Sequence, residues 1–126
     1  MKRYLIAILV LAVILSVILV NVSLMDTIAA DFRERLEAIE TLVRADDWEG
    51  AKAGMEAFAE EWDKKKTYLM ALLDHQTIDK INLPLERIQG YLEYNDKPPF
   101  VAECRVLVET FSDIREGQKI SLVNIF

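Results

Sequence analysis

The chain has 126 residues, which is enough for one small domain, and it carries 15 basic and 21 acidic residues. The resulting net charge of −6 argues against nucleic acid and against anionic lipid headgroups as binding partners. Hydrophobic residues make up 52% of the chain, which is high for a soluble domain, and the excess is concentrated at the N-terminus.

An apolar run opens the chain. No charge lies between Arg3 and Asp26, and residues 4–25 would extend about 33 Å as a helix, which is enough to cross a bilayer core. We therefore expect an uncleaved anchor that contacts the lipid bilayer through residues 4–25. The alternative is a cleaved signal peptide, but the run is longer than the apolar region of such peptides, and only a weak Thr27-x-Ala29 pattern offers a cleavage site.

The charges beside this run predict its orientation. Lys2 and Arg3 precede it, and the positive-inside rule places them in the cytoplasm. Residues 1–25 would then be a single-pass anchor in the cell membrane with a cytoplasmic N-terminus, and residues 26–126 an extracytoplasmic domain. Cys104 is the only cysteine, so we expect a buried, apolar thiol and no internal disulfide.

Apolar residues at alternating spacings of three and four predict the first two helices. One pattern runs from Ile28 to Val43 and continues the apolar run. Asp46 or Asp47 would cap the next helix, whose apolar seam is interrupted only by Lys65. The apolar seam positions are Trp48, Ala51, Met55, Phe58, Trp62, Leu69 and Leu72. Because the stripe is continuous, core packing of its aromatic residues is favoured over a ligand-binding groove.

The third predicted helix contains a proline. Its apolar positions step from Ile78 to Leu92, after a reversal of the chain near residues 74–77. Pro84 predicts either a kink in this helix or a late start with Asn82 as its cap.

The fourth predicted helix follows the loop sequence EYNDKPPF. Its apolar pattern runs from Phe100 to Ile114, and Gly117 is the candidate C-cap. Residues 120–126, ISLVNIF, alternate like extended chain and are too apolar to be left in water. We expect this tail to fold back into a groove of the bundle; the alternative is that it docks on a partner membrane protein.

These elements define the fold class. We expect an all-α protein in which an N-terminal transmembrane helix is followed by an antiparallel helical bundle, with about four helices in total counting the anchor helix, and by a short extended C-terminal tail.

The single histidine is the candidate for chemistry. His75 follows Asp74 and lies four residues before Asp79, so the three could form a corner with a general base or a metal ligand. A metal would need a third protein ligand, and no activated nucleophile or phosphate loop accompanies the corner. We therefore expect no catalytic, cofactor-binding or metal site, and interpret His75 and Asp74 as helix caps bonded across a turn.

Several short motifs resemble one bacterial family. DDWEGA, EEWDKKKTYL, LLDHQTIDKI, LERIQGYLE and SLVNIF, in this order after an N-terminal span, are similar to the domain-of-unknown-function family numbered 4363. The resemblance implies a short, single-span helical protein of Gram-positive spore-forming anaerobes. It also implies an association with other small membrane proteins, some linked to sporulation, and it transfers no catalytic residue.

Two classes of function remain open. The favoured one is a membrane-anchored extracytoplasmic module that interacts with, or is accessory to, another membrane protein. The alternative is a small-ligand or metal binder, or an enzyme, that uses the His75/Asp79 corner. The oligomeric state does not follow from the sequence.

Overall fold

The computed structural model describes the backbone of residues 1–125 and the side chains of residues 1–117. It contains four α-helices: α1 (Lys2–Arg44), α2 (Trp48–Leu72), α3 (His75–Glu93) and α4 (Lys97–Ile125). The described backbone contains no strand. The expectation of an all-α protein with about four helices, the anchor included, is confirmed.

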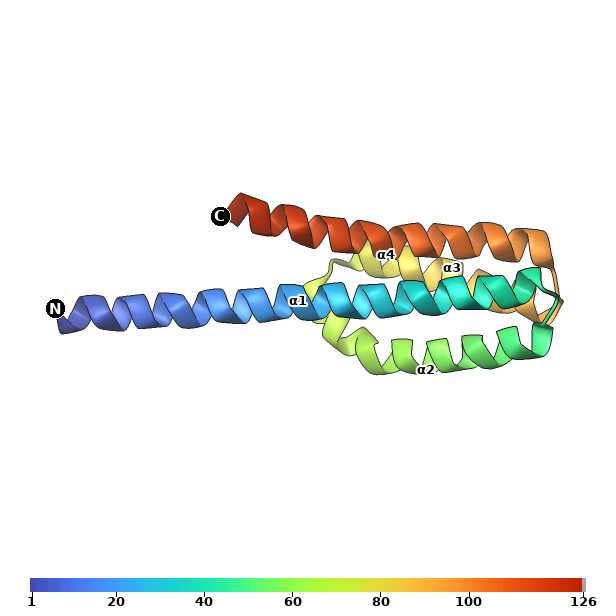
Figure 1. Ribbon diagram of the computed structural model, residues 1–126, viewed down its shortest axis with the longest axis horizontal. Helices are drawn as coiled ribbons and strands as arrows, with labels where there is room; N and C mark the ends of the chain where they lie inside the picture. Colours follow the sequence, from blue (N-terminus) through green and yellow to red (C-terminus); the bar gives the residue numbers. More distant parts are fainter. Residues whose placement is uncertain (126) are drawn as a thin grey trace.

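The helices form a ring in which each packs against the preceding and following helix, and α4 closes the ring on α1. The chain turns back after each helix (Figure 1). The register of α1 and α4 follows from two ion pairs: Arg105 Nε lies 3.3 Å from Glu40 Oε1, and Arg115 Nε lies 2.9 Å from Asp26 Oδ1. Positions on α1 therefore fall as positions on α4 rise.

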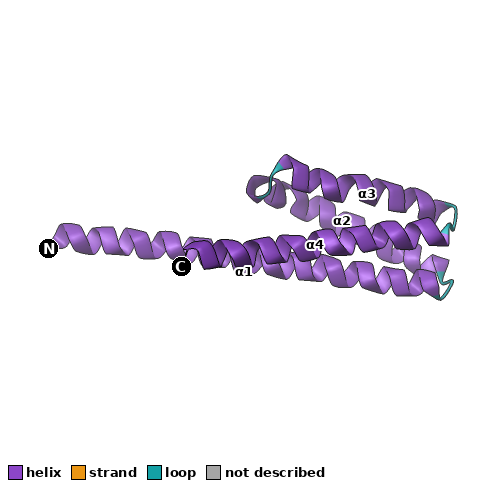
Figure 2. Ribbon diagram, turned by 90° about the horizontal axis from the view of Figure 1, so that it is seen from above, coloured by secondary structure: helices purple, strands orange, loops and turns teal. Residues whose placement is uncertain are grey.

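Helix α1 is continuous through the boundary expected between anchor and domain. Its first half projects beyond α2 and α3, its N-terminal part projects beyond α4 as well, and its second half forms one side of the bundle (Figures 1 and 2). Burial begins at Met25 and recurs at helical spacing as far as Val43. The predicted continuity between the apolar run and the first amphipathic segment is thus confirmed.

The centre of the core is a cluster of four aromatic side chains. Phe32 of α1 has its ring centroid 5.1 Å from Phe58, 5.7 Å from Trp62 and 5.4 Å from Phe111. Helices α1, α2 and α4 therefore meet through edge-on and stacked rings, which favour well-defined relative positions. The core role expected for the seam of α2 is confirmed at Ala51, Met55, Phe58, Trp62 and Leu69.

The start of α3 corrects one sequence-based alternative. Asp74 caps the helix and α3 begins at His75, so the late start capped by Asn82 is wrong. Pro84 lies inside the helix, where it cannot donate a backbone hydrogen bond to the carbonyl of Lys80. Asn82 instead accepts a hydrogen bond from the indole of Trp62 (3.0 Å), which ties α3 to the aromatic cluster.

The end of α4 corrects another expectation. The helix continues through Gly117 to Ile125, so Gly117 is not a C-cap and the backbone of residues 120–125 is not extended. A helix satisfies its own backbone hydrogen bonds, whereas a single extended segment would need a neighbouring strand. The packing expected of the tail side chains lies outside the described residues, as does Phe126.

Alanine substitutions at two of the glycines are expected to change the stability of the protein in opposite directions. A Cβ at Gly90 would meet nothing within 4 Å, whereas at Gly50 it would lie 2.5 Å from Oδ2 of Asp47, the residue that caps α2. We expect Gly90→Ala to raise the free energy of unfolding by about 0.5–1 kcal/mol, because alanine restricts the unfolded chain. Gly50→Ala, the matched control, should instead lower the melting temperature in detergent, since the cap must move.

Candidate functional site

The side chains of Asp74, His75 and Asp79 do not form one shared site. Asp74 Oδ1 accepts a hydrogen bond from the backbone amide of Thr77 (3.0 Å), as a helix cap does. Hydrogen bonds from Thr77 also lower the pKa of Asp74 below its ordinary value. The side chain of His75 is exposed at the first position of α3, and no hydrogen bond links it to Asp74 in the part of the chain that the structure describes. The expected cap role is confirmed for Asp74 and is wrong for His75, which is the first residue of α3.

Asp79 faces a different feature, a groove between α3 and α4. The groove has a volume of about 590 Å³ and contains neither Asp74 nor His75 among its lining residues. The histidine and the carboxylate that would have to act together are therefore placed apart. Within residues 1–117, no group of three histidine, cysteine or acidic side chains is arranged to hold a metal ion.

Alanine substitutions at His75 and Asp74 test the structural role of this corner. We expect His75→Ala to cost no more than about 1–2 kcal/mol of unfolding free energy, the scale of one hydrogen bond. Asp74→Ala should cost more than His75→Ala, because it leaves the amide of Thr77 without its side-chain acceptor. Thermal unfolding of the full chain in detergent, followed by circular dichroism, compares the two variants. A larger loss for His75→Ala would mean that this side chain holds something else.

The groove between α3 and α4 was not identified from the sequence. Its apolar part comes from Leu83 and Val106, which are 53% and 48% exposed, and from the ring of Pro84. An ion pair between Arg87 and Glu103 (3.0 Å) crosses it and links the two helices. The spacing of apolar residues from Ile78 to Leu92 predicts which face of α3 is buried, and Leu83 is not on that face. That Leu83 lines a groove together with Val106 follows only from the packing of α3 on α4.

Helix α1 carries the membrane-anchor signal. It is the one helix in the described part of the chain long and apolar enough to cross a membrane, with a mean hydropathy of 3.2 over its most apolar 18 residues, none of them buried. The structure therefore contains a candidate transmembrane helix where the sequence predicts one. Asn21, late in the apolar run, accepts a hydrogen bond from the Tyr68 hydroxyl (2.9 Å), so the end of α2 lies close to this run.

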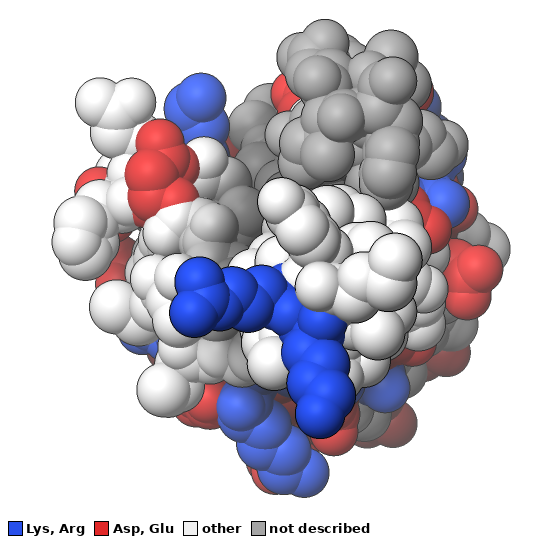
Figure 3. All heavy atoms as spheres, turned by 90° about the vertical axis from the view of Figure 1, so that its left-hand side faces the viewer, with Lys and Arg blue, Asp and Glu red and all other residues white. Residues whose placement is uncertain are grey.

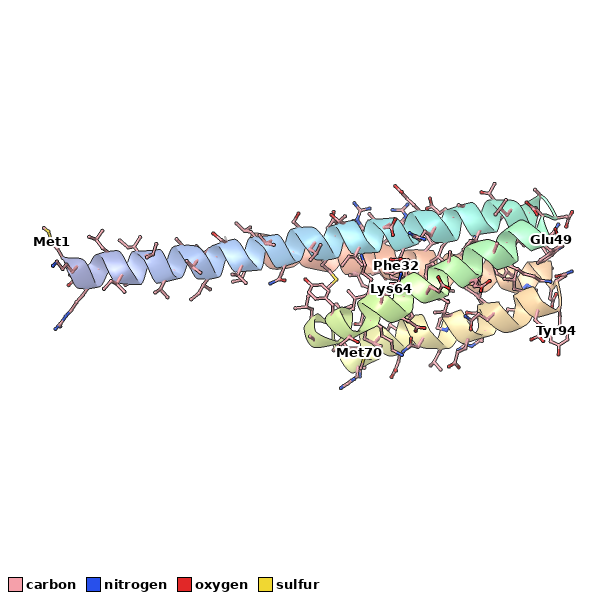
Figure 4. All side chains as sticks on the ribbon, turned by 90° about the horizontal axis from the view of Figure 1, so that it is seen from below. Met1, Phe32, Glu49, Lys64, Met70 and Tyr94 are labelled. Atoms are coloured by element: carbon pink, nitrogen blue, oxygen red, sulfur yellow. The ribbon has the colours of Figure 1, made fainter. Side chains whose placement is uncertain are left out.

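The end of the bundle nearest the apolar run has a distinct surface. Met70 lies at this end of α2, and Glu49 and Tyr94 lie at the opposite end of the molecule (Figure 4). Met70 and Leu72 are each 44% exposed. Seen along α1 from its N-terminal end, uncharged side chains surround the basic groups in the foreground, and acidic side chains lie mainly toward the edge of the view (Figure 3).

The predicted burial of Cys104 is confirmed. The thiol lies between α4 and α1, where Sγ is 3.5 Å from the carbonyl oxygen of Leu36. Loss of hydration on burial, reinforced by the negative charges of Glu40 and Glu37, raises the pKa of Cys104 to about 12. A thiol in this state is a poor nucleophile at neutral pH.

Comparison with known proteins identifies a family by sequence. The model of the family described as "Domain of unknown function (DUF4363)" matches residues 19–125, which include the last residues of the apolar run, the whole bundle and the end of α4. Searches of curated proteins and of solved structures found no match.

Proposed function

Because the chain belongs to the DUF4363 family of domains of unknown function, which carries no assigned activity, we propose a role from its architecture. The protein is a single-pass membrane protein whose extracytoplasmic helical bundle acts as an interaction or accessory module for another membrane protein. One observation carries this proposal: the uncovered apolar half of α1 is continuous with a bundle core that holds no buried polar residue among the described side chains.

The first part of the proposal concerns the membrane. A water-exposed helix with the hydropathy of α1 would leave about twenty apolar residues unprotected, whereas a bilayer core covers a helix of that length. Lys2 and Arg3 favour a cytoplasmic N-terminus. Residues 26–126 then lie outside the cytoplasm, and residues 1–25 remain attached as an anchor.

Topology is testable by labelling in intact cells. In a Cys104→Ala background, Lys64→Cys places a thiol on the exposed face of α2, and a cysteine added directly after Met1 (position 2 of that variant), which keeps Lys2 and Arg3, is the matched control. We expect a membrane-impermeant maleimide to label position 64 and not position 2. Labelling of position 2 alone would reverse the orientation, and a mature N-terminus near Asp31 would mean that the apolar run is a cleaved signal peptide.

The second part of the proposal concerns the partner. The groove between α3 and α4 offers Leu83 and Val106 as exposed apolar side chains within a charged rim, which is the pattern of a partner-binding surface. The rim carries both signs of charge, from Lys80 and Arg87 on one side and Glu103 on the other. A protein segment with an apolar centre suits this surface better than a nucleic acid does.

Photocrosslinking in native membranes tests this surface. A photoreactive amino acid at Val106 should give a discrete crosslinked product with one membrane protein, identified by mass spectrometry. The same group at Glu109, also on α4 but outside the groove, is the control. Equal products from both positions, or none from position 106, would remove the groove from the proposal.

The alternative function has less support. A ligand or metal binder, or an enzyme, would use His75 and Asp79, but only Asp79 lines the groove. We therefore propose a non-enzymatic role. The link to sporulation rests on the family resemblance alone, and it predicts that the protein is made during spore formation, which a time course of its abundance would test.

A further inference from the structure

The end of α4 extends beyond the rest of the bundle. The turn between α2 and α3 ends the bundle at about the level of Met25, because Leu73 in that turn lines the same small space as Met25, Ile28 and Ile114. Helix α4 continues past this turn, beside the projecting half of α1 (Figures 1 and 2). We define the overhang as residues 118–125, the part of α4 that follows Gly117.

The register of α4 on α1 places the overhang along the apolar run. Arg115 pairs with Asp26, the first charged residue after that run. From Arg115 to Ile125, α4 rises about 15 Å at the usual rise per residue. Because positions on α1 fall as positions on α4 rise, the end of α4 reaches the middle of residues 4–25.

The composition of the overhang matches this location. Its sequence is QKISLVNI, and Lys119 is the last charge before Ile125. Four of the six residues after Lys119 are Ile, Leu or Val. The two polar ones, Ser121 and Asn124, are of the kinds that bond between neighbouring helices inside membranes.

The helical backbone also fits a lipid environment. Inside a bilayer every backbone polar group needs a partner, and a helix provides these partners within itself. An extended tail, as the sequence pattern suggested, would leave them unsatisfied in lipid. The continuation of α4 to Ile125 is therefore compatible with lipid where an extended segment is not.

We propose that the overhang of α4 lies in the bundle-side leaflet of the membrane that α1 spans, in contact with lipid acyl chains. This inference rests on the proposed membrane anchor. The bundle is then held to the bilayer at two places, by the full span of α1 and by the half-span of α4. Met70 and Leu72, exposed at the bundle end, would meet the lipid interface.

Depth-dependent fluorescence quenching tests the proposal with the full chain in phosphatidylcholine vesicles. In a Cys104→Ala background, single cysteines at Leu122, Val123 and Ile125 sample three directions around the helix and receive an environment-sensitive fluorophore. Val10, in the apolar run, is the membrane control, and Glu109, exposed on α4, is the water control. Quenchers are iodide in water and lipids with a nitroxide on the acyl chain.

The expected result is that all three overhang positions resist iodide, as Val10 does, and that at least one is quenched several-fold more strongly by nitroxide lipid than Glu109 is. Iodide quenching like that of Glu109 would place the overhang in water. Protection from both quenchers at all three positions would mean that protein covers it, through α1 or a second copy. Either outcome overturns the proposal while Val10 still reports the anchor; a Val10 signal like that of Glu109 would refute the anchor itself.

Discussion

Trp62→Ala is expected to lower the free energy of unfolding by about 3–5 kcal/mol, the cost of removing a large side chain from a packed core. Trp62 is 2% exposed, and its ring lies edge-on to those of Phe32 and Phe111. The substitution also leaves the amide of Asn82 without its indole partner. Since small proteins are stabilised by only about 5–15 kcal/mol, this loss is severe. Urea unfolding of the full chain in detergent, followed by circular dichroism, measures it.

The matched control is the other tryptophan. Trp48 is half-buried at the first position of α2, where it packs on the edge of the core. Trp48→Ala should therefore cost clearly less than Trp62→Ala in the same measurement. Equal losses would mean that the aromatic cluster around Phe32 is not the part of the core that holds the bundle together.

Because the pKa of the buried Cys104 thiol is raised, we expect the free energy of unfolding to fall at alkaline pH. Its pKa is raised to about 12 in the folded protein from an ordinary value of 9.0, so the folded state holds its proton where the unfolded state has released it. The stability contribution of the neutral thiol is complete below pH 9 and falls as the pH rises toward 12. Between pH 9 and pH 10.5 we expect about 2 kcal/mol of this contribution to disappear, at about 1.4 kcal/mol per pH unit.

The variant Cys104→Ala isolates that effect, because every other titrating group is shared with the parent chain. At pH 7.5 the variant should be less stable by about 1–2 kcal/mol, since a buried group is missing. By pH 10.5 the difference between the two proteins should have vanished or reversed. Unfolding free energies from urea titrations at both pH values decide the matter. A constant difference would mean that the folded thiol titrates normally.

The core was predictable from the sequence because helical periodicity and burial have the same physical cause. Positions such as Phe58 and Trp62 recur on one face of α2, and only that face excludes water. Leu72 was expected on the same stripe but is 44% exposed. It is the last residue of α2, at the end of the bundle.

The errors lie where tertiary context overrides a local signal. Gly117 and the alternation of residues 120–126 both favour an end of the helix on local grounds. The helix nevertheless continues to Ile125, past the turn between α2 and α3 and at the level of the apolar half of α1. Pro84 is a similar case, because the packing of Ile81 and Leu85 on either side of it holds the helix together despite one lost hydrogen bond.

The candidate site was predictable only in part. Asp74 as a cap follows from its position before an apolar periodic segment. The groove that contains Asp79 does not, because it depends on which residue of α4 lies opposite Leu83, and no local pattern carries that register. The pairing of Arg115 with Asp26 depends on the same tertiary register.

In the proposed membrane arrangement, the uninterrupted course of α1 fixes how far each part of the bundle stands from the bilayer. From Met25 to Arg44 the helix rises about 29 Å, so, if residues 4–25 span the bilayer as proposed and α1 stands upright, the turn that holds Asp46 and Lys97 together lies about that far from the lipid surface. A helix without a break cannot fold the bundle down onto the bilayer. In that arrangement, a partner with only short loops outside the membrane would reach the near end of the bundle, and a partner that contacts Tyr94 or Glu49 would itself have to extend about as far from the bilayer.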